Sequence, residues 1–517
     1  MSVWPVGRLL LEGIAPHGAL DSAVLLEVLG TPSTWNALWR SVLTAAGGTL
    51  VALAIGVPFA ALVALSDIRA KPALVFCFMI PLMIPPQITA LSWIQLFGPS
   101  SALLKTLGLA PPLGTPHPLY SPQGIMLLLG VQHAPLVFLA LRASLRSLPR
   151  ELVEAARSSG ATHRHVVSHI VLPLMRPALI AGGALAFVSG LGNFGIPAML
   201  GIPISYATMP VLIYQRLSGF GPAVISEVAV LSLLIALVAA LGIVLQSKMT
   251  ASRDYRIGGA SALPLRLTLG RWRVATELCC WLVIILILVV PLLALLATSL
   301  VPAYGVVLTS DTATLEAYRE VLLRQPSTTR AFGNSFTLAL MAAVVLMAIA
   351  LPLGYLLTRK RSRTTRALAT LAEIPYALPG VVLAIACILI FIKPLPVLGF
   401  ALYGTLWIIF FAYLARFLAL ALRPVMAGFE QLDPHLEEAA QISGAGFLFR
   451  FRTIIVPSIG PVAAAGAILV FMTAFNELTV SALLWSSGTE TLGVLVYNLD
   501  DGGYTSLATA LAIVAVA

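Results

Sequence analysis

Charged side chains are scarce in this sequence. Asp, Glu, Lys and Arg make up 10% of its 517 residues, whereas soluble domains carry about 25%. Ten charge-free stretches approach or exceed the roughly 20 residues with which a helix crosses a bilayer. They are residues 42–66, 72–104, 118–141, 177–215, 228–247, 278–310, 331–358, 374–392, 394–415 and 453–476. Because the alternating pattern of barrel strands is absent, the sequence predicts an all-α, polytopic membrane protein.

Cysteine is also scarce, and several functional motifs are missing. The four cysteines lie in apolar stretches without the spacing of metal ligands, so we expect them to pack in the core or against lipid. They are Cys77, Cys279, Cys280 and Cys387. No metal site, cofactor or catalytic residue is predicted, and no signal peptide is evident. The phosphate-binding motif G-x-x-x-x-G-K-S/T is absent too, so we do not expect the chain to bind ATP by itself.

Positive charge is in excess, but it is confined to a few places. The net charge is +10, and 23 of the 31 Lys and Arg residues fall in five segments. Placing all five on the cytoplasmic side lets the apolar stretches alternate without conflict, as the positive-inside rule requires. The segments are 69–71, 142–176, 248–273, 359–366 and 416–452. The excess therefore predicts a membrane topology and no nucleic-acid partner.

One polar passage occurs twice. EAARSSGATHRHVVSHIVLPLMRPA begins at Glu154, and EAAQISGAGFLFRFRTIIVPSIGPV begins at Glu438. At a constant offset of 284, fifteen identities fall within 40 positions, with Glu, Gly and Pro among them. We interpret this likeness as an internal duplication.

Six expected spans separate the two passages, so both face the same side and the repeats are parallel. We predict two six-span repeats, 1–247 and 276–517, joined by a basic cytoplasmic linker at 248–275. Val3–Leu11 resembles the end of the second repeat's opening span, and the last span stops at Ala517. We therefore expect most of the first span and part of the last to be missing from this sequence.

Each passage predicts a short helix lying along the membrane surface. Glu151 suits its first turn, Ala155 and Ala156 give it a small face, and Gly160 ends it. A small face would let another protein approach closely, whereas the alternative is an amphipathic helix resting at the lipid interface. Occurrence at two matching positions favours the protein partner.

The pattern E-A-A-x-x-x-G with downstream proline resembles the cytoplasmic loop of permease subunits of ATP-binding-cassette importers. In that family the loop forms a coupling helix that sits in a cleft of the ATP-hydrolysing subunit. The resemblance covers essentially the whole chain and implies a transport subunit, not an enzyme, in the bacterial inner membrane. It also implies two copies of a cytoplasmic ATP-binding subunit and a periplasmic substrate-binding protein as partners. The implied coupling residues are Glu154, Ala155, Ala156, Gly160, Glu438, Ala439, Ala440 and Gly444.

The fused double arrangement resembles the ferric-iron and thiamine branches of these importers. Leu191–Pro203 and Asn476–Asn498 look most like the ferric-iron branch. The resemblance therefore favours ferric iron as the substrate, with thiamine or another small solute as the alternative. A secondary transporter is the rival class, because parallel repeats also occur there.

Two polar residues occupy matching places within the spans. Asn193 and Glu477 correspond at the offset of 284, and polar groups inside a bilayer usually face a cavity or a partner. Both are candidates for lining the transit path, and hydrogen bonding between helices is the open alternative. For Glu373 and His133, hydrogen bonding between helices is the favoured interpretation.

Two pairs of prolines share a P-x-x-x-P spacing: Pro81 with Pro85, and Pro375 with Pro379. Proline interrupts the hydrogen bonds of a helix, so each pair predicts a kinked span. A static kink for packing is favoured over a hinge.

Overall fold

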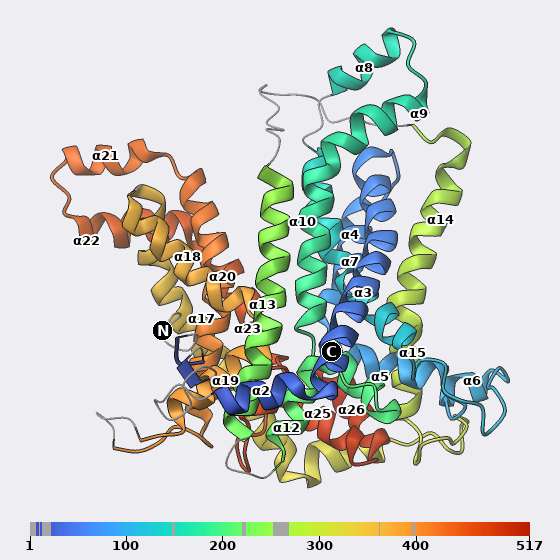
Figure 1. Cartoon of the computed structure of the whole chain (residues 1–517). Helices are drawn as coiled ribbons and strands as arrows, with labels where there is room; N and C mark the ends of the chain where they lie inside the picture. Colours follow the sequence, from blue (N-terminus) through green and yellow to red (C-terminus); the bar gives the residue numbers. More distant parts are fainter. Residues whose placement is uncertain are drawn as a thin grey trace. The chain divides into compact units, whose positions relative to one another are not determined.

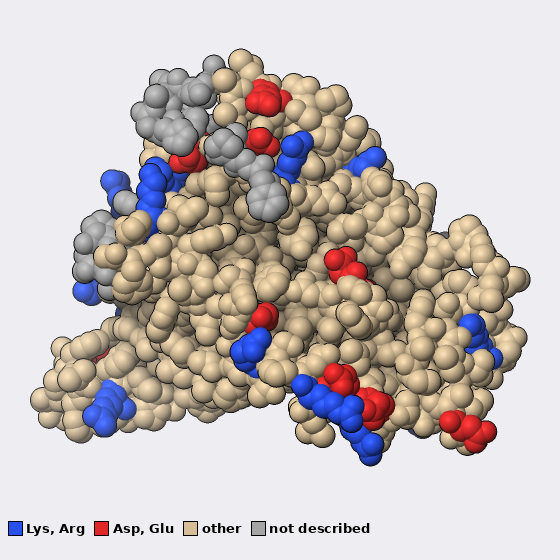
Figure 2. All heavy atoms as spheres, turned by 90° about the horizontal axis from the view of Figure 1, so that it is seen from below, with Lys and Arg blue, Asp and Glu red and all other residues tan. Residues whose placement is uncertain are grey.

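Helices account for the secondary structure of the described chain. Eight of them are long and apolar enough to cross a membrane, and up to eleven spans result if three sharply bent helix pairs each count as one. Figure 2 shows a face on which charged side chains are few and scattered. These features confirm an all-α, polytopic membrane protein. The computed structural model describes residues 7–9, 11–12, 22–146, 150–219, 224–251, 268–360, 362–394 and 399–516.

The chain divides into two compact units that do not coincide with the sequence repeats. Each unit joins most of one repeat to the opening segment of the other. The predicted boundaries 1–247, 248–275 and 276–517 remain a prediction about repeats, and linker residues 252–267 lie outside the described part. Unit 1 comprises Met1–Gly30, Ile213–Leu233 and Arg324–Leu495, and unit 2 comprises Thr31–Leu212, Leu234–Leu323 and Val496–Ala517.

Unit 2 is built around long helices, with α8 and α9 at one end and α6 and α26 at the opposite end (Figure 1). Its helices are α3 (Pro32–Leu65), α4 (Lys71–Met83), α5 (Pro86–Phe97), α6 (Ala102–Thr106), α7 (Pro122–Arg146), α8 (Arg150–Ser158), α9 (His163–Val166), η2 (Val167–Val171), α10 (Leu172–Leu191), α11 (Gly195–Gly201), η3 (Ile202–Ile204), η4 (Gly270–Trp272), α14 (Arg273–Ile284), η5 (Ile285–Val289), α15 (Val290–Ser299), α16 (Glu316–Arg319) and α26 (Thr505–Val516).

Unit 1 places α21 and α22 at the end of its long helices (Figure 1). Its helices are α2 (Ser22–Gly30), α17 (Pro326–Arg359), α18 (Arg363–Ala377), α19 (Gly380–Phe391), α20 (Leu406–Gln431), α21 (Pro434–Ile442), α22 (Phe447–Arg450), η7 (Phe451–Ile455), α23 (Val456–Phe475) and α24 (Ser481–Leu484). Four elements contribute residues to both units: α12 (Met209–Leu217), α13 (Val224–Ala251), η6 (Glu320–Arg324) and α25 (Leu492–Asp501).

Small residues allow the helices of unit 2 to pack closely. A β-carbon at Gly56 would lie 2.7 Å from the Ala134 carbonyl oxygen of α7, so α3 and α7 meet almost backbone to backbone. Next to this contact the rings of Phe59 and Phe78 stack at 3.9 Å, and Phe138 lies 5.2 Å from Phe78. The close approach and the aromatic cluster together join α3, α4 and α7.

The opening span of the second repeat is anchored in unit 2 by polar contacts. Asp67 accepts a hydrogen bond from the Leu269 backbone N–H at 3.0 Å, and this bond, with Arg273 nearby, lowers the Asp67 pKa. Glu277 accepts from the Arg69 backbone N–H at 2.7 Å and from Arg273 Nε at 3.1 Å. These contacts join the turn between α3 and α4 to the start of α14.

Two spans are broken at the paired prolines. The helical segments Lys71–Met83 and Pro86–Thr106 are bent by 100° relative to each other, and the segments Arg363–Tyr376 and Gly380–Phe391 by 102°. Pro85 and Pro379 are the N-caps of α5 and α19. Since neither proline has a backbone N–H, each preceding helix loses a hydrogen bond there. The predicted kinks are confirmed, while a hinge function stays untested.

Candidate functional site

The duplicated passages fold into two surface loops with the same element boundaries. The first loop consists of α8, α9 and η2, and the second loop consists of α21, α22 and η7. Adding 284 to each boundary in the first loop gives the boundary in the second, and the match continues from α10 to α23. The duplication read in the sequence is therefore a duplication of local structure, including a matching π-helical turn in each loop.

Both loop helices end in the same hydrogen-bonded turn. The Ala161 N–H donates to the Ala156 carbonyl at 3.0 Å, and the Ala445 N–H donates to the Ala440 carbonyl at 3.0 Å. This bond belongs to the Schellman motif, which requires a residue in the left-handed conformation. Gly160, with φ of 84°, and Gly444, with φ of 82°, fill that position. Because φ near +80° is unfavourable for residues with a β-carbon, the motif's glycine has a structural reason.

The predicted coupling residues lie on the accessible side of each loop helix. Glu154, Ala155, Glu438 and Ala439 are exposed, and both glycines of the motif are exposed as well. The second alanine of each motif is half-buried. This arrangement presents a small, accessible surface bordered by a carboxylate, and the coupling role of these residues stays a prediction.

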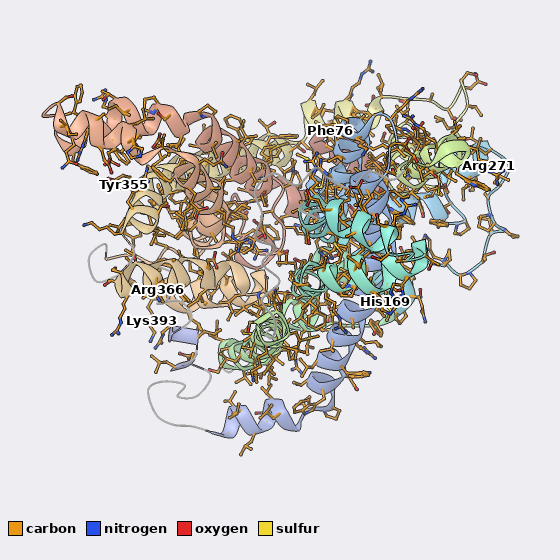
Figure 3. The ribbon with its side chains drawn as sticks, turned by 90° about the horizontal axis from the view of Figure 1, so that it is seen from above. Phe76, His169, Arg271, Tyr355, Arg366 and Lys393 are labelled. Carbon is orange, nitrogen blue, oxygen red and sulfur yellow. The ribbon has the colours of Figure 1, made fainter. Side chains whose placement is uncertain are left out.

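The two helices are held to their units by different chemistry at one matching position. Val153 of α8 is buried, with 2% of its surface exposed. Its counterpart, Glu437 of α21, accepts a hydrogen bond from the Tyr355 hydroxyl and lies 4.0 Å from Arg359 Nε. Tyr355, labelled in Figure 3, belongs to α17 and also packs edge to face with Phe451. Sequence reasoning missed this anchor, because Val and Glu at one position share no pattern.

The second loop exposes large apolar side chains. Ile442 is 88% exposed and Leu448 is 76% exposed. Others of this kind are Leu436, Phe447 and Phe449. The first loop instead places two histidine rings together, His165 and His169, with centroids 4.0 Å apart. The two loops are thus alike in backbone and unlike in surface chemistry.

The side chains of Asn193 and Glu477 accept hydrogen bonds from the backbone at the start of the short helices that follow them. Asn193 Oδ1 accepts a hydrogen bond from the Ile196 backbone N–H at 3.1 Å. Glu477 Oε1 accepts from the Val480 N–H at 2.8 Å, and the two contacts coincide at the offset of 284. Both side chains are buried, with 7% of their surface exposed. That they line a transit path stays a prediction, and their oxygens are directed to backbone within their own segments.

Glu373 and His133, for which the sequence favours hydrogen bonding between helices, lie in different surroundings. Glu373 lies 3.5 Å from Arg423 in an exposed pair, and His133 is buried in α7. Cys280 and Cys387 are buried, whereas Cys77 is half-buried and Cys279 is exposed. Among the described residues no group of three or more His, Cys, Asp or Glu side chains is placed to hold a metal ion.

A family profile described as the binding-protein-dependent transport system inner membrane component matches residues 56–251 and 350–517. The matched segments make up more than half of the chain, and each contains one of the two loops. The chain belongs to this family. The resemblance read from the loops is therefore confirmed, and the protein is a permease subunit of an ATP-binding-cassette transporter.

Two relatives of this permease match along most of the chain, and a third matches along less than half of it. A probable ABC transporter permease of Sinorhizobium fredii is 27% identical over 470 residues, covering 89% of this chain and 81% of the relative. An Fe(3+)-transport system permease of Haemophilus influenzae is 25% identical over 500 residues, covering 95% and 89%. A molybdenum transport system permease of Mycobacterium tuberculosis is 30% identical over 222 residues, covering 41% and 79%.

Proposed function

We propose that this permease forms the membrane pathway of an ATP-driven importer and passes ferric iron into the bacterial cytoplasm. The observation that supports ferric iron as the substrate is the extent of the match to the Fe(3+)-transport permease, which covers 95% of this chain. The molybdenum permease matches over 41% of the chain. A relative that shares both repeats is the better guide to the task of a chain in which the repeats are fused.

ATP hydrolysis belongs to a partner in this proposal. Two copies of a cytoplasmic ATP-binding subunit would each receive one loop, and closure of the ATPase pair would push on α8 and α21. The matching backbone of the loops supports two equivalent contacts with the ATP-binding subunits, because identical clefts on the two copies would require two similar helices. A periplasmic binding protein would deliver the substrate at the opposite side of the inner membrane.

Uptake by cells that lack and regain the gene tests the substrate. Expression of the gene should restore accumulation of labelled iron and leave labelled molybdate and labelled thiamine unchanged. Restoration of molybdate or thiamine uptake with unchanged iron uptake would reject ferric iron and keep the importer. Transport by the chain without an ATPase, driven by an ion gradient, would reject the importer and favour a secondary transporter.

A further inference from the structure

We propose that Arg416 and Glu477 in unit 1, and Gln132 and Asn193 in unit 2, are the charged and neutral versions of one positioning device. In unit 1, Arg416 lies beside the broken span and next to Glu477, which binds the backbone at the start of α24. In unit 2, Gln132 joins the two halves of the broken span, and Asn193 binds the backbone of α11. The inference rests on the proposed function only for its uptake readout. It assigns the carboxylate of Glu477 to holding structure, in place of attracting a cationic substrate.

The neutral version repairs the break between α4 and α5. Pro85 has no N–H to offer the Pro81 carbonyl, and Gln132 Nε2 donates to that carbonyl at 2.8 Å. The same nitrogen donates to the Ile84 carbonyl at 3.0 Å, while Gln132 Oε1 accepts from the Thr89 hydroxyl at 2.9 Å. One buried amide thus satisfies polar groups on both sides of the bend.

The charged version occupies the corresponding place in unit 1. Arg416 stands 284 residues after Gln132, as Glu477 does after Asn193. Arg416 Nε lies 4.0 Å from Glu477 Oε1, and a β-carbon at Gly380, the first residue of α19, would overlap the Arg416 guanidinium. The guanidinium therefore fills the space beside the break between α18 and α19.

The oxygens of Glu477 are largely committed within unit 1. Its two oxygens accept from the Val480 N–H at 2.8 and 3.1 Å. Oε2 also accepts from the Ser481 N–H at 3.1 Å and from the Ser481 hydroxyl at 3.2 Å. The Ser481 hydroxyl in turn lies 2.7 Å from that of Tyr413 on α20. With Arg416 beside it, this carboxylate has little acceptor capacity left, and the pair as a whole carries no net charge that would attract a passing cation.

Each unit contains a similar close contact between its broken span and the segment of its short helix. In unit 2 a β-carbon at Gly195 of α11 would lie 3.0 Å from the Gln87 backbone nitrogen of α5. In unit 1 a β-carbon at Gly380 of α19 would lie 2.9 Å from Thr479 Cγ2, just before α24. A glycine allows close approach in both units, from the short-helix segment in one and from the broken span in the other.

Both members of the pair differ between the units, and the physics of burial gives the reason. A poorly exposed charge without its partner is costly inside a membrane protein, whereas two neutral residues carry no such cost. Changing one member alone therefore leaves an uncompensated charge. Changing both to the residues of the other unit removes both charges together.

The test compares Arg416→Gln, Glu477→Asn and the double variant in the complete transporter. Each single variant should lower the amount of folded permease several-fold, because it strands a charge. The double variant should recover both the amount and the iron uptake per transporter to within about two-fold of wild type, because the coupling lies in the pair. The matched control is Arg423→Gln, on the same helix as Arg416 (α20), which breaks the exposed pair with Glu373 of α18. It should leave both the amount and the uptake unchanged.

Three results would overturn the inference. Single variants with normal amounts would show that the pair positions nothing, and a double variant as poor as the singles would show that the neutral version cannot replace it. A double variant with a normal amount but reduced uptake at low iron would show that Glu477 acts on the substrate. Permease amount and co-purified ATPase do not depend on the substrate, so failure of ferric-iron transport itself would be recognised separately.

Discussion

At the scale of single residues, backbone conformation explains the glycines of the loop motif. Gly444 has φ of 82° and open space around its α-carbon, so a side chain there meets no atom and is penalised only by the backbone. Gly446, two residues later, also has open space, and its φ of −64° is ordinary. Comparing substitutions at Gly444 and Gly446 therefore distinguishes an effect of backbone conformation from an effect of steric crowding.

Gly444→Ala should therefore weaken coupling while Gly446→Ala does not. The left-handed conformation costs a residue with a β-carbon about 1 kcal/mol, which will fray the end of α21. We expect substrate-stimulated ATP hydrolysis by the assembled transporter to fall several-fold for Gly444→Ala. Equal activities of the two variants would contradict this explanation of the motif.

Asp500 provides a second prediction at the residue scale. Burial, with neighbouring Asp501 adding to it, raises the Asp500 pKa from 3.8 to about 6. Because the folded state then binds a proton more tightly than the unfolded state, the stabilisation is present below the ordinary pKa and is lost as pH rises through the folded pKa. The Tm of the purified wild-type protein should therefore fall, relative to Asp500→Asn, between about pH 4 and about pH 7. Parallel pH profiles would contradict the shift.

At the scale of elements, each loop helix needs an anchor, and the two repeats use different ones. Burial of Val153 holds α8, whereas the contacts of Glu437 with Tyr355 and Arg359 hold α21. The polar anchor depends on one hydroxyl, which can be removed without disturbing the aromatic packing of Tyr355.

Tyr355→Phe should loosen α21 specifically. Loss of a hydrogen bond to a charged group costs about 2 kcal/mol, so amide hydrogen exchange in Pro434–Ile442 should accelerate while exchange in Arg150–Ser158 stays unchanged. Tyr376→Phe is the matched control, because the Tyr376 ring faces Arg423 in the exposed part of α18 and α20. Equal exchange of α21 in both variants would show that the hydroxyl does not anchor the helix.

At the scale of the whole molecule, the predicted topology rests on the basic segments and on the even number of spans expected between the two loops. Ser158 and Ser443 are exposed on the two loops, and Ser487 is exposed in the segment between α24 and α25. These positions allow the predicted orientation to be read from either side of the membrane.

Cysteines introduced at Ser158 and Ser443 should react only with reagent that reaches the cytoplasm, and a cysteine at Ser487 only with reagent outside. The native cysteines are first replaced, because Cys279 is exposed. A permease with the native cysteines removed and none introduced is the control for background labelling. Opposite labelling of the two loops would contradict parallel repeats.

The amino-acid sequence by itself determined that this is an all-α membrane protein, that it contains a duplication, and where glycines and prolines end or bend its helices. Each of these has a local signature: uncharged runs long enough to span a bilayer, a passage repeated at a constant offset, and residues with special backbone conformations. The kinks at Pro85 and Pro379 and the helix end at Gly160 were predictable for this reason.

Only the tertiary structure decided where the polar side chains of the spans point and which segments pack together. Asn193 and Glu477 accept hydrogen bonds from nearby backbone N–H groups, Arg416 lies close to Glu477, and the start of α14 is attached to the turn at Asp67. The last two contacts join residues 61 and 202 positions apart. Such contacts leave no local pattern, because a buried carboxylate is equally compatible with a transit path, a helix cap and an ion pair until its neighbours are known.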